Sequence, residues 1–186
     1  IYDLDLASMY PNIIISLNIS PETKVGFVSN WNMEKHCAGE IETYLVRDKD
    51  SEQVVKLTRE HFIKFMNDMH YFISSNGVLY NATKQGIIPE VLEKWFTERV
   101  EYKNLMKKYK SEGNTELAEF YDRRQHIQKI FLNSLYGVLG LPIFRFFDID
   151  NALAVTASGQ DVIKDSAEFV NKLYQDKLSD DKDHCI

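Results

Sequence analysis

The sequence has few of the features that mark disulfide-bonded, zinc-binding or membrane-spanning proteins. Its two cysteines, Cys37 and Cys185, lie far apart and without the spacing of metal ligands. This excludes a disulfide framework and a zinc site, and it indicates a reducing compartment. No basic segment precedes an apolar stretch, and the longest aliphatic run near the start is Ile13 to Ile15, so we expect neither a signal peptide nor a membrane span. A soluble, cytoplasmic protein is expected.

The composition is that of a globular protein. Of the 186 residues, 44% are hydrophobic and 27% are charged, which predicts one compact domain, or one domain and part of a second. The chain begins at Ile1 and closes at Ile186 in a run that looks like the start of a strand. We therefore expect a piece of a longer protein.

The net charge of -6 hides a segregation of charge along the chain. Taken alone, this net charge argues weakly against binding to nucleic acid. Residues 94–129, however, contain nine basic and six acidic side chains, a net charge of +3, so the rest of the chain carries -9. Such a pattern is expected where an anion is bound in one place and carboxylates hold cations in another, or where two solvated helix faces carry ordinary charges.

Short elements are predicted in the N-terminal half, and two long helices follow them. The short elements are a strand over 1–6, helical turns over 13–17, a helix over 58–72, and a hairpin at Asn76-Gly77 with a second turn at Gln85-Gly86. Residues 20–57 show no sustained period. Pro89 fits the first position of a helix that runs to Lys110, and a second helix begins at Asn114 or Thr115 and runs to about Tyr136, where Gly137 is a natural stop. The four-residue connection makes these two helices an antiparallel pair, and a further capped helix follows the aromatic run that begins at Ile143.

Cations and an amide are predicted to face each other across this helical pair. Arg99 and Lys103 are four residues apart on the first helix, and Lys129 and Asn133 are four apart on the second. Arg and Lys at such a surface can hold a polyphosphate, although solvated faces or salt bridges account for the same spacing. An apolar stripe of the second helix is predicted to pack and to leave Lys129 and Asn133 on another side; it includes Phe120, Ile127 and Phe131.

The first residues combine carboxylates with a turn. Asp3 and Asp5 are two apart, so on a strand both side chains point to one face. Such a pair can hold Mg²⁺. The alternative is that both carboxylates lie on the exposed face of an edge strand and bind no metal. In the turn over residues 7–10, successive N–H groups can converge into a site for an anion.

Three segments, in order, resemble the motifs of the family B DNA polymerases. "DLASMYPNII" (5–14) is similar to their carboxylate motif, Asp-x-x-Ser-Leu-Tyr-Pro-Ser-Ile-Ile, with Met9 for Leu and Asn12 for Ser. "KIFLNSLYGVLG" (129–140) resembles the fingers motif Lys-x-x-x-Asn-Ser-x-Tyr-Gly, and "IIPEVLEKWFTERVEYK" (87–103) resembles the first fingers helix. Two further segments, 18–26 and 144–160, are more similar to the replicative polymerases of T-even-type bacteriophages than to cellular or protein-primed members.

This resemblance implies an α+β fold: a partial polymerase palm, made of antiparallel strands with packed helices, and a projecting two-helix fingers hairpin. Residues 1–86 would form the first part of the palm with an insertion, 87–137 the fingers, and 138–186 the second part of the palm, truncated before the second metal motif. That motif, a strand ending in Asp-Thr-Asp-Ser, is absent, so we expect the fragment alone to catalyse little or nothing.

The resemblance also implies roles for single residues. Asp5 would be catalytic as a ligand of two Mg²⁺ ions, with the Leu6 carbonyl as a further ligand, while Asp3 would be structural. The N–H groups of Ser8, Met9 and Tyr10 would bind the nucleotide. The Tyr10 ring would lie under the deoxyribose and exclude ribonucleotides. Four fingers residues would also bind the nucleotide: Arg99, Lys103, Lys129 and Asn133. Tyr136 and Gly137 would lie near the nascent base pair.

The expected function is template-directed transfer of deoxynucleotides to a primer 3'-hydroxyl by a two-metal mechanism in viral DNA replication. The expected partners are primer-template DNA, deoxynucleoside triphosphates and a sliding clamp bound through a C-terminal region missing here, in the host-cell cytoplasm. Two alternatives stay open: a noncatalytic nucleic-acid-binding subunit that retains the fold, and another two-metal phosphotransferase or nuclease.

Overall fold

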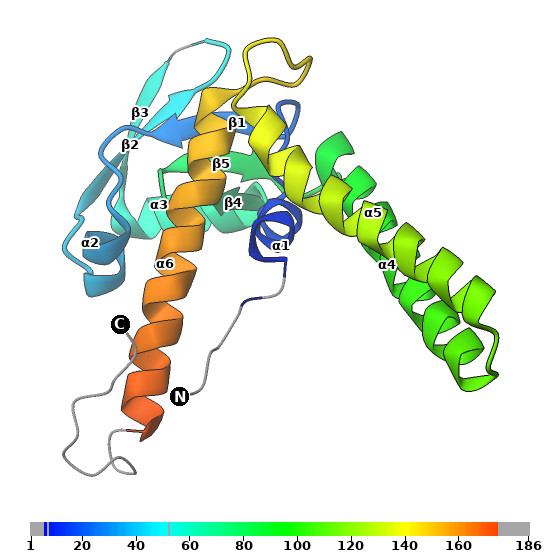
Figure 1. The fold of residues 1–186 in the computed structure, drawn as a ribbon. Helices are drawn as coiled ribbons and strands as arrows, with labels where there is room; N and C mark the ends of the chain where they lie inside the picture. Colours follow the sequence, from blue (N-terminus) through cyan, green and yellow to red (C-terminus); the bar gives the residue numbers. More distant parts are fainter. Residues whose placement is uncertain (1–5, 7, 52, 175–186) are drawn as a thin grey trace.

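The computed structural model describes residues 6, 8–51 and 53–174, which form a mixed α+β fold (Figure 1). A five-stranded antiparallel sheet has the strand order β3-β2-β1-β5-β4. The elements, in chain order, are α1 (Met9–Ser16), β1 (Lys24–Val28), α2 (Met33–Ala38), β2 (Thr43–Asp48), β3 (Val54–Thr58), α3 (Arg59–Asp68), β4 (Tyr71–Ile73), β5 (Val78–Asn81), α4 (Ile87–Ser111), α5 (Thr115–Leu139) and α6 (Ile149–Tyr174). None of the helices in the described ranges is long and apolar enough to cross a membrane.

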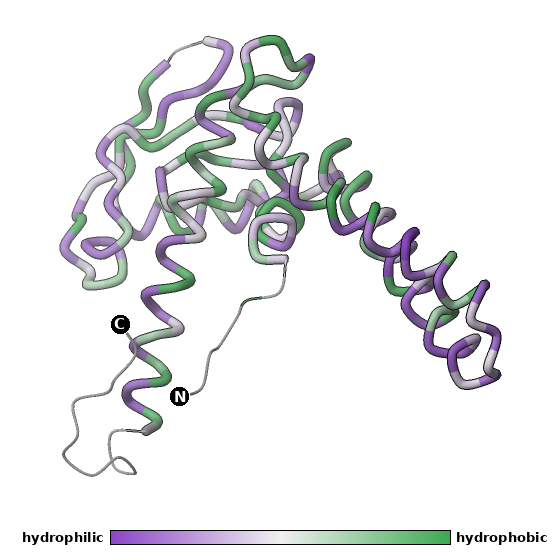
Figure 2. Tube along the Cα trace, viewed as in Figure 1, coloured by the Kyte–Doolittle hydropathy of each residue, from purple (hydrophilic) through white to green (hydrophobic). Residues whose placement is uncertain are grey.

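The sheet packs against other elements on both of its faces. Neighbouring residues of a strand point to opposite faces, so one strand contributes to both layers. On β5, Val78 and Tyr80 belong to one buried cluster, which they share with α1, α4, α5 and α6. Leu79, between them, belongs to a second cluster formed with β1, β2 and Phe62 of α3. Figure 2 shows hydrophobic residues where the helices meet the sheet and hydrophilic residues at the far end of the α4–α5 hairpin. The first cluster is the one that positions the candidate site.

Local turn signals predicted the β4–β5 hairpin correctly. Gly77 lies at φ +86° in its turn, and a Cβ added there would lie 2.7 Å from the Cβ of Trp31, so a glycine is required. The helix predicted over 58–72 is present but shorter, since α3 ends at Asp68 and the chain turns through His70 at φ 54° into β4. The strand predicted over 1–6 falls outside the described residues except for Leu6, which lies in no strand.

The two long helices form the predicted antiparallel pair, and they project from the body of the molecule (Figure 1). Asn114 caps α5, because its side chain accepts a hydrogen bond of 3.2 Å from the Leu117 N–H. The predicted stop at Gly137 was wrong: α5 continues to Leu139, whose fully buried side chain holds the last turn in the core. The stop falls at Gly140 instead.

The predicted packing stripe of α5 contacts α4 in part, since Phe131 packs against Trp95 with 5.5 Å between the ring centroids, but the stripe is not buried. Phe120, Ile127 and Phe131 are each close to half exposed, whereas the buried residues of this helix are Ala118, Leu132 and Leu139. A hairpin that projects into solvent covers only the seam between its two helices, so most of its apolar residues stay accessible. Lys129 and Asn133 are exposed, as expected from the sequence.

Candidate functional site

A pocket of about 580 Å³ lies where the start of α1 meets the α4–α5 hairpin. It joins the first turn of α1 to side chains that are more than 80 residues away in the sequence. Its lining consists of Leu6, Ser8, Met9, Tyr10, Pro11, Arg99, Lys129, Asn133 and Tyr136. Eight of the eleven site residues predicted from the sequence are in this lining. Of the others, Lys103 and Gly137 are exposed outside it, and Asp5 lies outside the described residues.

The start of α1 lines one side of this pocket. Ser8, the residue before the helix, has left-handed backbone angles (φ 54°, ψ 41°), and its side chain makes no capping hydrogen bond. The Ser8 carbonyl accepts a hydrogen bond of 3.1 Å from the Asn12 N–H. The first N–H groups of a helix have no partner within the helix, and they carry partial positive charge. No acidic residue lies in the first turn of α1, so this end of the helix favours an anion.

The hairpin adds positive charge on the facing side. Arg99 is half buried, and its Nε has no hydrogen-bond partner among the described residues. Lys129 and Asn133 lie one turn apart on α5 and are exposed. None of the described side chains that line the pocket is acidic. The described lining therefore suits a negatively charged ligand.

Tyr10 connects the two sides of the pocket. Its ring packs against the ring of Tyr136 on α5, with 4.5 Å between the ring centroids and 32° between the planes. Both rings line the pocket. A flat apolar surface therefore adjoins the cationic one, which suits a ligand that joins an anion to a ring.

Asn18, just after α1, fixes the end of that helix to the start of α4. Its side chain is buried and makes three hydrogen bonds: Nδ2 donates to the carbonyls of Asn81 (2.6 Å) and Lys84 (2.8 Å), and Oδ1 accepts from the Gly86 N–H (2.8 Å). Its backbone has φ 56°, a conformation that asparagine tolerates better than most residues. Sequence reasoning did not single out this residue, because its partners lie more than 60 residues away.

Glu22 strengthens the same junction. Its Oε1 accepts a hydrogen bond of 2.5 Å from the Ile87 N–H, the first residue of α4, and its Oε2 accepts one of 2.7 Å from the Ser20 hydroxyl. Burial opposes ionisation, but these hydrogen bonds outweigh it and lower the pKa of Glu22 below its ordinary value. The carboxylate therefore acts as a charged cap for the helix that carries Arg99.

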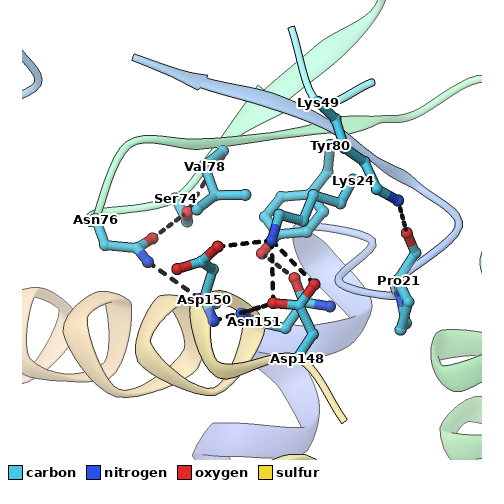
Figure 3. Close-up of polar contacts among 10 residues, drawn as sticks. All are labelled: Pro21, Lys24, Lys49, Ser74, Asn76, Val78, Tyr80, Asp148, Asp150 and Asn151. Carbon is cyan, nitrogen blue, oxygen red and sulfur yellow. Dashed lines mark hydrogen bonds and ion pairs between the residues drawn. The ribbon is translucent and has the colours of Figure 1, made fainter. Parts of the chain in front are cut away.

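On the other side of α1, α6 is tied to the sheet by an ionic cluster (Figure 3). The Lys24 ammonium on β1 contacts both oxygens of Asp148 (3.0 and 2.9 Å) and one oxygen of Asp150 (2.7 Å). Asp148 also caps α6, since it accepts hydrogen bonds from the N–H groups of Asp150 (3.0 Å) and Asn151 (3.2 Å). Burial opposes the charge on Lys24, but the two carboxylates outweigh it and raise the pKa of this lysine. The start of α6 is therefore held by charge as well as by packing.

A buried hydrogen bond supports the cluster. The Tyr80 hydroxyl on β5 donates to Oδ1 of Asn151 at 2.8 Å (Figure 3). Burial and the nearby charges of Asp148 and Asp150 raise the pKa of Tyr80, so its phenol stays protonated and remains a donor. The residues of this cluster were not predicted from the sequence, in which they are up to 127 positions apart.

The described residues do not by themselves provide a metal site. Within the ranges that the structure covers, no group of three or more His, Cys, Asp or Glu side chains could hold a metal ion. The pocket offers the position of Leu6 but no carboxylate. A magnesium site would therefore depend on Asp5, which lies outside the described part of the chain.

Comparisons with known proteins agree with the geometry. A family described as DNA polymerase family B matches residues 1–185. The DNA polymerase of fowlpox virus (strain NVSL) is 30% identical over 161 residues, covering 86% of this chain and 15% of that protein. The DNA-directed DNA polymerase of Enterobacteria phage T4 is 27% identical over 220 aligned positions, covering 92% of this chain and 22% of that protein.

The fold has a counterpart among solved structures. A family B DNA polymerase from the archaeon Pyrobaculum calidifontis superposes with a TM-score of 0.60 and 23% sequence identity, covering 91% of this chain and 18% of that one. The chain thus spans between 15 and 22% of the length of these relatives. From the family match over nearly all of its length, together with this fold, we conclude that the chain belongs to the family B DNA polymerases.

Proposed function

We propose that this chain supplies the nucleotide-binding part of the active site of a template-directed DNA polymerase. The observation that carries the proposal is the pocket, which unites the start of α1, the Tyr10 ring and the polar residues of the hairpin. In this proposal residues 1–86 and 138–186 belong to the palm and 87–137 to the fingers. Primer-template DNA and deoxynucleoside triphosphates are its partners. The viral setting, the host-cell cytoplasm and a sliding clamp stay predictions of the sequence resemblance.

The triphosphate would bind between the two positive sides of the pocket. Arg99 would give forked hydrogen bonds, and Lys129 a point charge with more freedom. Asn133 would donate from its amide, one turn further along α5. Lys103 lies one turn beyond Arg99 on α4 and outside the lining, and it would join the ligand when the hairpin closes. The N–H groups at Ser8, Met9 and Tyr10 would face the same phosphates.

The rings would select the sugar. A deoxyribose packed on the Tyr10 ring leaves no room for a 2'-hydroxyl, the group that distinguishes RNA precursors from DNA precursors. Tyr136, in contact with Tyr10, and the neighbouring Gly137 would then lie beside the nascent base pair.

Asp5 and the Leu6 carbonyl are the groups of this chain that we propose as magnesium ligands, since carboxylate and carbonyl oxygens suit this ion. When bound, two such ions would supply the activation of the primer hydroxyl and the stabilisation of the leaving pyrophosphate. The chain's own cations would neutralise the triphosphate and hold it in line for attack.

The test is DNA synthesis by the complete gene product that contains this chain. Incorporation of labelled deoxynucleotides on a primer-template is expected, and Lys129→Ala should raise KM for the nucleotide by about tenfold or more, the cost of one charge-assisted hydrogen bond. Lys107→Ala is the matched control, since it removes an exposed lysine of α4 that does not line the pocket. Strand cleavage without synthesis, DNA binding without either reaction, or equal effects of the two variants would each contradict the proposal.

A further inference from the structure

Gly159 occupies an unfavourable place for a glycine, in the middle of the 26-residue helix α6. In a helix interior a glycine is less favourable than alanine by about 1 kcal/mol. Gly159 does not have the positive φ that would require a glycine. A glycine at such a position indicates a close approach by another element.

The element that approaches is the first turn of α1. A Cβ added at Gly159 would lie 3.0 Å from Cε1 of Tyr10, 3.3 Å from Cε of Met9 and 3.5 Å from Cδ1 of Ile13. The first two of these distances are shorter than ordinary carbon contacts. Glycine thus lets the Tyr10 ring lie directly on the backbone of α6. The same ring also packs against the ring of Tyr136 on α5.

This part of α6 is fixed. The neighbouring Ser158 is buried, and its hydroxyl accepts a hydrogen bond of 3.1 Å from the Ser75 N–H in the β4–β5 turn. Asn76 of the same turn donates to the Asp150 carbonyl at 3.1 Å. Because α6 is bound to the sheet at both places, a side chain added at Gly159 would displace Tyr10 and Met9 more easily than it would displace the helix.

We infer that Gly159 is a positioning residue that sets how far the Tyr10 ring enters the nucleotide pocket. The inference rests on the proposed function, because it concerns the same sugar-binding ring. Gly159 does not line the pocket, whereas Tyr10 and Tyr136 do. A ring displaced from Gly159 by a few tenths of an ångström therefore changes its position against Tyr136 or within the pocket. The selectivity for the sugar thus depends on a residue that the nucleotide does not touch.

The experiment is a double-mutant cycle in the complete gene product, with Gly159→Ala made in the natural background and in a Tyr10→Ala background. In the natural background Gly159→Ala should raise KM for deoxynucleotides by about tenfold, as expected for overpacking of a tight contact. The turnover number should change by less than about twofold, because the ring contacts the sugar and not the reacting atoms. In the Tyr10→Ala background the added methyl group meets no ring, and KM should stay within about twofold.

Gln160→Ala, at the exposed neighbouring position, is the control for helix α6 and should leave KM unchanged. Thermal unfolding should show Gly159→Ala folded and close in stability to the natural protein, since the gain in helix propensity offsets the cost of the tight contact. An unchanged KM in Gly159→Ala, or equal changes in both backgrounds, would overturn the inference while the proposed function stands. If Tyr10→Ala itself leaves ribonucleotide discrimination unchanged, the proposed role of Tyr10 fails, and the inference fails with it.

Discussion

Replacing Lys24 by methionine should weaken the attachment of α6 to the sheet, because methionine keeps the apolar stem and removes the charge. The Lys24 and Asp148 side chains are only 11 and 17% exposed, whereas Asp150 is 51% exposed. A hydrogen bond between charged groups contributes about 1.5–3 kcal/mol, and water replaces most of the contact that Asp150 loses. Asp148 keeps its hydrogen bonds to α6 but loses its countercharge. We therefore expect Lys24→Met to lower the free energy of unfolding by about 2–3 kcal/mol.

Urea unfolding followed by circular dichroism measures this loss. With a slope of about 2 kcal/mol per molar urea, the midpoint should fall by about 1–1.5 M. Lys172→Met is the matched control: Lys172 pairs with Glu168 at 2.5 Å, but both side chains are more than 60% exposed, so little change is expected. Because the folded state raises the pKa of Lys24 above 10.5, its contribution should be complete below that pH and be lost as the pH rises through the folded value. Equal shifts in the two variants would refute the reasoning.

Three further predictions concern the residues around α1. Asn18→Ala removes three buried hydrogen bonds and should cost about 3 kcal/mol or more in urea unfolding, whereas Asn104→Ala, at an exposed position of α4, should cost much less. Because the pKa of Glu22 is lowered on folding, its contribution to stability is present above pH 4.5 and is lost as the pH falls through the folded pKa. Glu22→Gln should remove this acid sensitivity. The same pH profile of the urea midpoint in the variant and the natural protein would contradict this prediction. Tyr10→Ala should increase ribonucleotide incorporation by the complete gene product, measured as the ratio of kcat/KM values for the two sugars.

The parts of the fold that could be predicted from the sequence are those with local signals. Asn76-Gly77 marks a tight turn by its chemistry, and Asn114 marks a helix start three residues before the N–H that it caps. The apolar spacing of the two long helices recurs over many turns, so their existence does not depend on distant contacts. The burial of their side chains does depend on such contacts, which is why Phe120 and Ile127 of the predicted stripe stay about half exposed.

The remaining features follow from long-range contacts that a single sequence does not reveal. Three of the five strands lie in 20–58, almost all of it the segment where no period is visible. Short strands with turns between them leave a weak pattern, and β1 is paired on both sides, with β2 and β5. In the sequence nothing distinguishes Lys24 and Asn18 from other polar residues, because their partners lie far away along the chain. Most residues of the pocket lining were named from the sequence, but through short motifs resembling a known family, and their roles stay predictions. Spacing alone gave two pairs of polar residues on separate helices, the Asp3/Asp5 pair and the N–H groups of one turn.

The pocket depends on a helix that is too short to be stable alone. α1 has eight residues, fewer than the roughly 12–15 that an isolated helix needs in water, so its neighbours impose its geometry. Asn18 binds its end to the start of α4, Tyr136 of α5 packs on its first turn, and Gly159 lets that turn lie on α6. Since α4 and α5 also carry the cations of the pocket, the distance between these cations and the Tyr10 ring is set by the same packing. A change that loosens α6, such as Lys24→Met, should therefore raise KM for the nucleotide although Lys24 does not line the pocket.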